Sequence, residues 1–240
     1  MLEQFLYVGL PYAALFMFLI GSIIRVKNFG YTVTSHSSQF FETRLLYWGS
    51  RFFHIGIISV LAGHLIGFIA PSFVIKMTTI PLGLTIIESA AFSFAVLALI
   101  GITILMYRRI VTSRLYSVTT GVDIFVYLII VIQIVIGMLV AYYNRWGSAW
   151  YASSLVPYLK SLFIFMPDTK VIVTMPLLIK IHTVSAFLFL AFVPFSRLIH
   201  FLVYPVSYFF RNYILVIWNR DMKAMRFSQN MREGKKPRNN

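Results

Sequence analysis

The sequence contains no cysteine. This absence excludes thiolate-ligated iron–sulfur clusters, thioether-attached haem and disulfide bonds within the chain. A redox cofactor would have to be held by histidine or methionine side chains, or belong to a partner protein.

Charged residues are also scarce: they form 12% of the chain, and 7 acidic residues stand against 21 lysines and arginines. Hydrophobic residues make up 59% of the sequence, and the mean hydropathy is +0.81. A water-soluble protein of 240 residues could not cover so much apolar surface with so few charges, so the composition indicates a polytopic membrane protein. The net charge of +14 does not indicate a nucleic-acid partner, because the basic residues lie between and after apolar runs.

Five apolar segments are long enough to cross a bilayer as helices. Helices are expected because lipid cannot satisfy open backbone groups, and the alternating strands of a barrel are not apparent. The sequence therefore predicts an all-α membrane protein with five transmembrane helices. The expected spans are Phe5 to Ile24, Phe52 to Ile69 (stopping near Pro71), Ser89 to Tyr107, Ile124 to Asn144, and Leu177 to about Val203.

Lysine and arginine concentrate in the connections after the first and third spans and in the C-terminal tail. By the positive-inside rule, the N-terminus lies outside and the C-terminus in the cytoplasm. The chain then divides into a transmembrane domain over residues 1–205 and a basic cytoplasmic tail over residues 206–240.

Two connections carry local structural signals. Thr120, with Asp123 three residues later, predicts a capping box at the start of the fourth span, which gives Asp123 a structural role. The fourth connection is rich in aromatic residues around Pro157, and we expect one or two short amphipathic helices in the outer interface. Its aromatic residues are Trp146, Trp150, Tyr151 and Tyr158.

Four histidines lie within two apolar spans. His54 and His64 are ten residues apart, about 15 Å along a helix, and His182 and His200 are eighteen apart, about 27 Å and on one face. One intramembrane histidine is as readily explained by a hydrogen bond to a neighbouring helix, but four of them indicate function, since buried polar groups are costly in lipid. Zinc fits poorly without cysteine or a mid-depth carboxylate, whereas a six-coordinate haem iron needs only two axial imidazoles.

The predicted topology decides how the histidines pair. The second span runs outward and the fifth runs inward, so His54 and His200 lie near the cytoplasm and His64 and His182 nearer the outside. We therefore expect an inner haem iron between His54 and His200 and an outer one between His64 and His182. The two irons would be about 20 Å apart along the membrane normal.

Smaller signals surround these ligands. Ser59, Gly63 and Gly67 form a stripe that would let a flat macrocycle approach the helix, although ordinary small-residue helix packing explains it equally well. Arg51 and Arg197 each lie one turn before a histidine, at the depth of haem propionates or of ordinary positive-inside charges. We leave His36 out of the ligand set, and we expect Gln133 to form an interhelical hydrogen bond. No residue is assigned a catalytic role with certainty.

These motifs resemble one family over nearly the whole chain. The sequence is similar to the gamma subunit of respiratory nitrate reductase, the di-haem cytochrome b that anchors the complex in the membrane. The matching residues are Phe53-His54-Ile55-Gly56-Ile57, Gly63-His64, Thr119-Thr120-Gly121 with Asp123, the run from Pro194 to His200, Ser37-Ser38-Gln39 and Pro205-Val206.

The resemblance implies a subunit with two haem b groups in the inner membrane of a prokaryotic cell. Quinol would be oxidised near the outer haem, and electrons would pass through the inner haem to a cytoplasmic iron–sulfur subunit. A molybdenum-containing partner subunit would then reduce nitrate.

One departure concerns the quinol site. The best-known family members carry a lysine just before the third span, where this chain has Thr85, and Lys76 and Glu88 are the nearest ionisable residues. The quinol-site candidates are therefore Gly63, His64, Lys76 and Thr85. The quinone and the direction of electron flow stay open, since a related complex could run as a nitrite oxidoreductase.

Other assignments stay open as well. Within the same class, the chain could be the cytochrome b anchor of a sulfur-metabolising or heterodisulfide-type complex. In other classes, it could be a proton-coupled transporter with a histidine relay, or a non-redox scaffold whose histidines are hydrogen-bonded in the core.

Overall fold

The computed structural model describes residues 1–29 and 42–202 of the chain. Within these residues, five helical segments are long and apolar enough to cross a membrane, which confirms an all-α fold with five spans. The direction in which each span crosses stays a prediction. The segments are Leu2–Asn28, Arg44–Ile69, Pro81–Val111, Gly121–Tyr143 and Leu177–Phe195.

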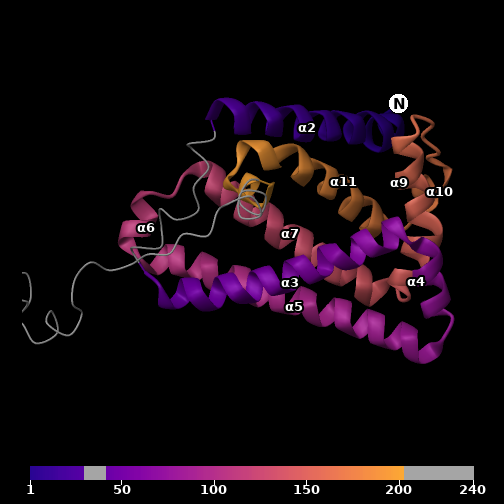
Figure 1. Ribbon diagram of the computed structural model, residues 1–240, viewed down its shortest axis with the longest axis horizontal. Helices are drawn as coiled ribbons and strands as arrows, with labels where there is room; N and C mark the ends of the chain where they lie inside the picture. Colours follow the sequence, from indigo (N-terminus) through magenta and orange to yellow (C-terminus); the bar gives the residue numbers. More distant parts are fainter. Residues whose placement is uncertain (30–41, 203–240) are drawn as a thin grey trace, which may run out of the picture. The chain divides into compact units, whose positions relative to one another are not determined.

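Figure 1 shows the elements that make up these spans. The first span combines α1 (Leu2–Gln4), η1 (Phe5–Gly9) and α2 (Leu10–Phe29). The next three are α3 (Arg44–Ile69), α5 (Pro81–Val111) and α7 (Gly121–Tyr143). The fifth is α11 (Leu177–Phe192) with the turn η5 (Val193–Phe195). Two connections hold α4 (Pro71–Thr78), which begins where the second span was expected to stop, and α6 (Ser113–Ser117).

Some predicted features lie outside the described residues. They are His36, the Ser37-Ser38-Gln39 and Pro205-Val206 motifs, and the basic tail over residues 206–240. The division of the chain at residue 205 therefore stays a prediction.

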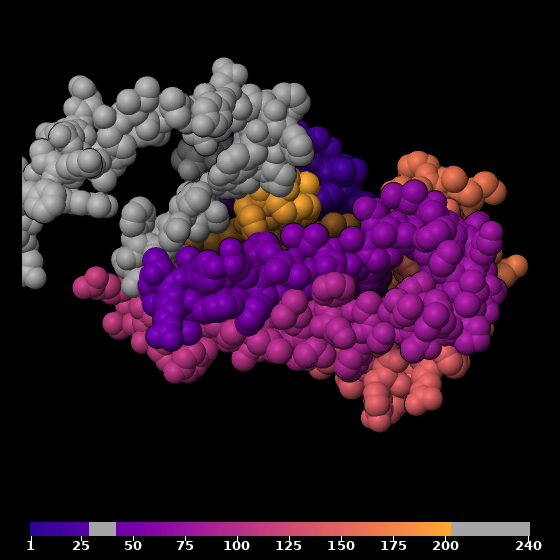
Figure 2. Space-filling view, turned by 60° about the horizontal axis from the view of Figure 1, so that its bottom comes forward, coloured from indigo at the N-terminus to yellow at the C-terminus, as the bar shows by residue number. Residues whose placement is uncertain are grey.

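Glycines on both helices allow α3 and α5 to pack closely (Figures 1 and 2). A Cβ atom on Gly56 would overlap the backbone of Ala98 in α5, and one on Gly101 would overlap the backbone of Phe53 in α3. In lipid there is no hydrophobic force between helices, so close van der Waals packing is a main source of helix association. These glycines fix the position of α3 and of the histidines that it carries.

The N-terminus of α7 confirms the predicted capping box. The Thr120 hydroxyl accepts a hydrogen bond from the Asp123 N–H at 3.2 Å, and the Asp123 carboxylate accepts one from the Thr120 N–H at 3.1 Å. Asp123 is only 7% exposed, and its carboxylate also pairs with Arg109 of α5 at 3.4 Å. This cap therefore ties α7 to α5 as well as starting the helix.

The fifth span is not one continuous helix to about Val203, so that prediction is wrong. The α-helix ends at Phe192, η5 follows, Ser196 is extended (φ −112°, ψ 173°), and the short helix η6 (Arg197–Ile199) leads to His200. Pro194 explains the break, because it has no N–H to donate and its ring clashes with the preceding turn. The separation of about 27 Å expected for a straight helix does not apply to His182 and His200.

The connection between α7 and α11 contains short helices, as predicted, but they are not confined to a surface. Tyr158 is 1% exposed, and its hydroxyl donates a hydrogen bond to the Tyr7 carbonyl at 2.8 Å. A phenol can be buried when its hydroxyl has an acceptor, so Tyr158 joins a core cluster with Tyr7 and Leu155. The position of these helices in the outer interface stays a prediction. The helices are α8 (Gly147–Trp150), η4 (Tyr151–Leu155), α9 (Val156–Phe163) and α10 (Lys170–Thr174).

We expect Gly56→Ala to destabilise the fold by about 1–3 kcal/mol, because the new methyl group would overlap the α5 backbone, which cannot move aside as a flexible side chain can. The thermal unfolding midpoint of the protein in mild detergent, followed by helical circular dichroism, should fall. Gly121→Ala is the matched control, because nothing lies within 4 Å of its new methyl group. Equal midpoints for the two variants would contradict the close packing of α3 on α5.

Candidate functional site

The structure brings the four intramembrane histidines together as two pairs. The ring centres of His54 and His200 are 6.2 Å apart, with an angle of 70° between the ring planes. The ring centres of His64 and His182 are 6.5 Å apart, with an angle of 39°. We call these the 54–200 pair and the 64–182 pair, and they are the pairs that the predicted topology gives.

Both separations match the geometry of two axial imidazoles on one metal ion. An imidazole nitrogen binds a transition metal at about 2 Å and lies about 1 Å from the centre of its own ring. Two imidazoles on opposite sides of one iron therefore have ring centres about 6 Å apart. The measured separations of 6.2 and 6.5 Å agree with this value.

Three of the histidines hold one ring nitrogen against a backbone carbonyl. The Nδ1 atom lies 2.7 Å from the Ser50 oxygen in His54, 2.9 Å from the Val60 oxygen in His64, and 2.9 Å from the Arg197 oxygen in His200. A carbonyl can only accept, so Nδ1 carries the proton and Nε2 keeps its lone pair. This arrangement is typical of metal-binding histidines, whose other nitrogen is held by a partner outside the metal site.

His182 has a different environment. Its Nδ1 atom is buried and has no hydrogen-bond partner, and its Nε2 atom lies 3.5 Å from the Gln133 amide nitrogen. Gln133 donates to the His182 carbonyl at 3.3 Å and accepts from the Ser185 hydroxyl at 2.5 Å. The predicted interhelical hydrogen bond of Gln133 is therefore confirmed. An unpaired buried ring nitrogen is costly, so the ring of His182 is less well satisfied than the rings of the other three histidines.

The glycines near the 64–182 pair differ in their surroundings. A Cβ atom on Gly63 would meet nothing within 4 Å, whereas one on Gly67 would lie 2.7 Å from the Tyr151 ring. A Cβ atom on Gly137 of α7 would lie 3.1 Å from the His182 ring. Gly63 thus leaves open space next to His64, as a flat macrocycle requires. Gly67 instead packs against Tyr151, so the predicted stripe of Ser59, Gly63 and Gly67 is not a single packing surface.

Metal coordination by side chains alone is a poor alternative. Among the described residues, no group of three or more histidine and acidic side chains could hold a metal ion. Zinc requires three or four protein ligands, whereas a haem supplies four nitrogens of its own and needs only two from the protein. The histidine pairs therefore fit haem iron, and the assignment of these ligands stays a prediction.

Tyr151 contacts the 64–182 pair, although the sequence suggested only an interfacial aromatic residue. Its hydroxyl donates to the His64 carbonyl at 3.0 Å, and its ring lies edge-on to the His64 ring with centres 5.3 Å apart. Burial raises the pKa of Tyr151 to about 12, so the hydroxyl keeps its proton at neutral pH and can donate. No local motif marks this role, because the contact joins residues 87 positions apart.

The segment that carries Tyr151 is anchored to α5 by Glu88. The Glu88 carboxylate accepts hydrogen bonds from the Ser148 N–H at 2.7 Å and the Ser148 hydroxyl at 2.6 Å. Glu88 therefore binds α8 through Ser148, which lies three residues before Tyr151. It was considered in the sequence only as an ionisable neighbour of Thr85.

The other predicted quinol-site residues are not brought to His64 by polar contacts. The Thr85 hydroxyl donates to the Pro81 carbonyl of its own helix at 2.8 Å, and Lys76 is exposed on α4. Among the described residues, neither side chain has a polar contact with His64. Gly63 and His64 are adjacent on α3, and all four candidates stay predictions.

The two arginines proposed for haem propionates have other neighbours. The Arg51 guanidinium lies over the Tyr47 ring, 4.2 Å from its centre. Arg197 forms an ion pair with Asp123, with Nε 3.1 Å from a carboxylate oxygen. Contact of either arginine with a propionate stays a prediction.

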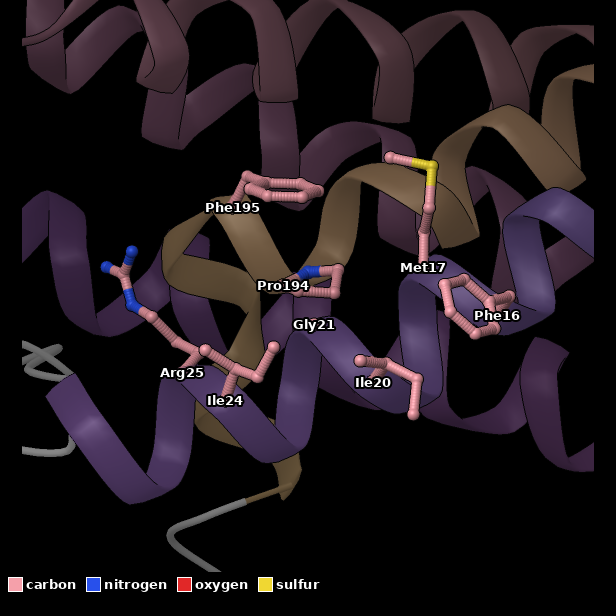
Figure 3. Close-up of a pocket in the computed structure, with 8 residues that line it drawn as sticks. All are labelled: Phe16, Met17, Ile20, Gly21, Ile24, Arg25, Pro194 and Phe195. Atoms are coloured by element: carbon pink, nitrogen blue, oxygen red, sulfur yellow. The ribbon is translucent and has the colours of Figure 1, made fainter.

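A shallow apolar groove lies between α2 and the break after α11 (Figure 3). Gly21 allows this approach, since its Cβ atom would lie 3.0 Å from the Pro194 ring. None of the four histidines lines the groove, so it is separate from both pairs. The lining residues are Phe16, Met17, Ile20, Gly21, Ile24, Arg25, Pro194 and Phe195.

Comparison with known proteins gives consistent matches over most of the chain. The family model described as nitrate reductase gamma subunit matches residues 3–219. The respiratory nitrate reductase 1 gamma chain of Escherichia coli (strain K12) is 31% identical over 220 residues, which cover 90% of this chain and 97% of that protein. The nitrate reductase gamma chain of Bacillus subtilis (strain 168) is 28% identical over 215 residues, covering 88% of this chain and 96% of that protein.

We expect Gly137→Val to displace the His182 ring, because even the Cβ atom would approach it to 3.1 Å. The purified chain should then contain about one haem instead of two, as measured by the pyridine haemochrome assay, with the 54–200 pair still loaded. Gly9→Val is the matched control, since a Cβ atom there would make only an ordinary contact of 3.6 Å with Phe5. Full haem content in Gly137→Val would contradict the role of the 64–182 pair.

Proposed function

The chain belongs to the nitrate reductase gamma subunit family, and we propose that it is the quinol-oxidising di-haem cytochrome b subunit of a membrane-bound nitrate reductase. In this proposal, electrons pass from quinol through an outer and an inner haem to a cytoplasmic iron–sulfur subunit. A molybdenum-containing partner subunit then reduces nitrate.

Family membership confirms the resemblance seen in the sequence. Together with the five membrane-capable helices among the described residues, it makes the chain a multi-pass protein of a prokaryotic membrane. It also makes the chain a subunit of an oxidoreductase complex. The haems, the quinol site and the individual partners belong to the proposal.

The spacing of the two histidine pairs is the observation that carries the proposal. Ring centres 6.2 and 6.5 Å apart suit two imidazoles on opposite sides of one iron. The free Nε2 atoms of His54, His64 and His200 offer three of the four necessary lone pairs, and His182 lies opposite His64 in the outer pair. When bound, each haem would supply reversible one-electron chemistry.

The position of the pairs along α3 supports transfer across the membrane. His54 and His64 are ten residues apart on one continuous helix, which corresponds to about 15 Å. Oxidation of one quinol releases two electrons and two protons, and release of the protons outside with inward electron transfer separates charge. Moving one electron across the full membrane against 100 mV costs about 2.3 kcal/mol, so the subunit would help to store membrane potential.

At the quinol site, Tyr151 and Glu88 extend the set of candidates. The phenol holds the His64 carbonyl, and the carboxylate fixes the segment that carries the phenol. Tyr151 thus contacts the 64–182 pair directly, and Glu88 holds the part of the fourth connection that carries Tyr151. We propose that they shape the quinol site in a chain that has Thr85 where the family has lysine.

We expect substitution of one histidine to remove one haem. His64→Ala or His182→Ala should abolish the outer haem and quinol oxidation, whereas His54→Ala or His200→Ala should abolish the inner haem and block onward transfer. Haem content and reduced-minus-oxidised spectra of the complex in membranes measure the loss of each haem. Quinol-driven haem reduction measures the loss of quinol oxidation and of onward transfer.

His36→Ala is the matched control, because His36 lies outside the predicted ligand set, and it should retain both haems. Substitutions that each left two haems and full activity would show that the pairing is wrong. A colourless wild-type protein would exclude the cytochrome assignment and favour a transporter or scaffold. Identification of the subunits that co-purify with the chain tests the nitrate reductase partners separately.

A further inference from the structure

We propose that Asp123 is a positioning residue for the inner haem, acting through Arg197 on the axial ligand His200. This inference rests on the proposed function. From the sequence, Asp123 was expected only to cap a helix, and Arg197 was a candidate partner for a haem propionate. The structure joins the two residues, and Arg197 in turn holds the His200 ring.

The contacts form a short chain from α7 to the 54–200 pair. One Asp123 carboxylate oxygen lies 3.1 Å from Arg197 Nε. The Arg197 carbonyl accepts the hydrogen bond of His200 Nδ1 at 2.9 Å, and the His200 ring centre lies 6.2 Å from that of His54. Arg197 therefore forms the ion pair with its side chain and orients the His200 imidazole with its backbone carbonyl.

The break after α11 leaves His200 without a continuous helix to hold it. His54, on α3, is held by an unbroken helix that packs closely against α5. His200 follows an extended residue and a single turn of η6, so continuity of the helix does not fix its position. The Ser196 hydroxyl accepts from the Leu198 N–H at 3.1 Å, which orders η6 locally, whereas the Arg197–Asp123 pair ties η6 to α7.

Burial gives the Asp123 carboxylate a fixed place. Its side chain is 7% exposed, while that of Arg197 is 47% exposed. A buried carboxylate is stable only when it is paired and hydrogen-bonded, and Asp123 has Arg109, Arg197 and the Thr120 N–H as partners. Arg109 is itself held by the Thr119 hydroxyl at 3.0 Å. The carboxylate is thus a fixed attachment point for η6.

The test uses the complete complex in membranes, with Asp123→Asn, Arg197→Gln, the double variant and Asp123→Glu. The readouts are the low-spin ferric EPR signals and the midpoint potentials of the two haems. The EPR signal of a bis-imidazole haem depends on the angle between its imidazole planes. That angle is 70° in one pair and 39° in the other, so the two signals should differ, and His200→Ala and His182→Ala assign them.

We expect both single variants to shift the inner-haem EPR signal in the same direction or to lose the inner haem, with the outer signal unchanged. The double variant should change the inner-haem signal by less than the sum of the two single changes, because each single variant already loses the Asp123–Arg197 contact. Asp123→Glu should restore much of the wild-type signal. Asp168→Asn, the same chemical change at an exposed site, is the matched control and should leave both signals unchanged.

A purely electrostatic role predicts a different pattern. Loss of a negative charge at Asp123 would raise the inner-haem potential, and loss of a positive charge at Arg197 would lower it. Opposite shifts with unchanged EPR signals would overturn the positioning role, as would no change in either variant.

The outer-haem signal reports folding in every sample. Arg197→Gln leaves the capping box and the Asp123–Arg109 pair in place, so it carries the test if Asp123→Asn does not accumulate. A wild-type complex without haem would refute the proposed function itself. Two haems with unchanged signals in the variants would refute only this inference.

Discussion

A polar group inside a bilayer must find its partner within the protein, because lipid offers none. The Nδ1 atoms of His54, His64 and His200 meet this requirement with backbone carbonyls close by in sequence. The other ring nitrogen is left as a donor of a lone pair. Hydrogen bonding thus decides the tautomer, and the tautomer decides what the imidazole can bind.

Helix α3 serves two purposes on different faces. Gly56 brings its backbone against α5, while Gly63 leaves open space next to His64. Because close packing holds the helix on one side, the histidines on another face can keep a fixed distance from α11 and η6. Glycine therefore allows close helix packing at position 56 and leaves space beside a histidine at position 63.

The two histidine pairs are supported in different ways. At the 64–182 pair, Tyr151 and Gln133 reach in from the fourth connection and from α7. At the 54–200 pair, a broken helix is tied to the buried Asp123 carboxylate through Arg197. In the proposed cytochrome, these different surroundings would give the two haems different potentials.

The sequence alone determined the five spans, the capping box of α7 and the four histidines, because each follows from local composition or from a spacing along one helix. It could not reveal the break at Pro194, since a proline within an apolar run ends some helices and only kinks others. It could not reveal the contact of Tyr151 with His64 or of Asp123 with Arg197 either, because each joins residues distant in sequence. Only the tertiary structure decides which side chains meet, since that depends on how the helices pack and not on the pattern within any one of them.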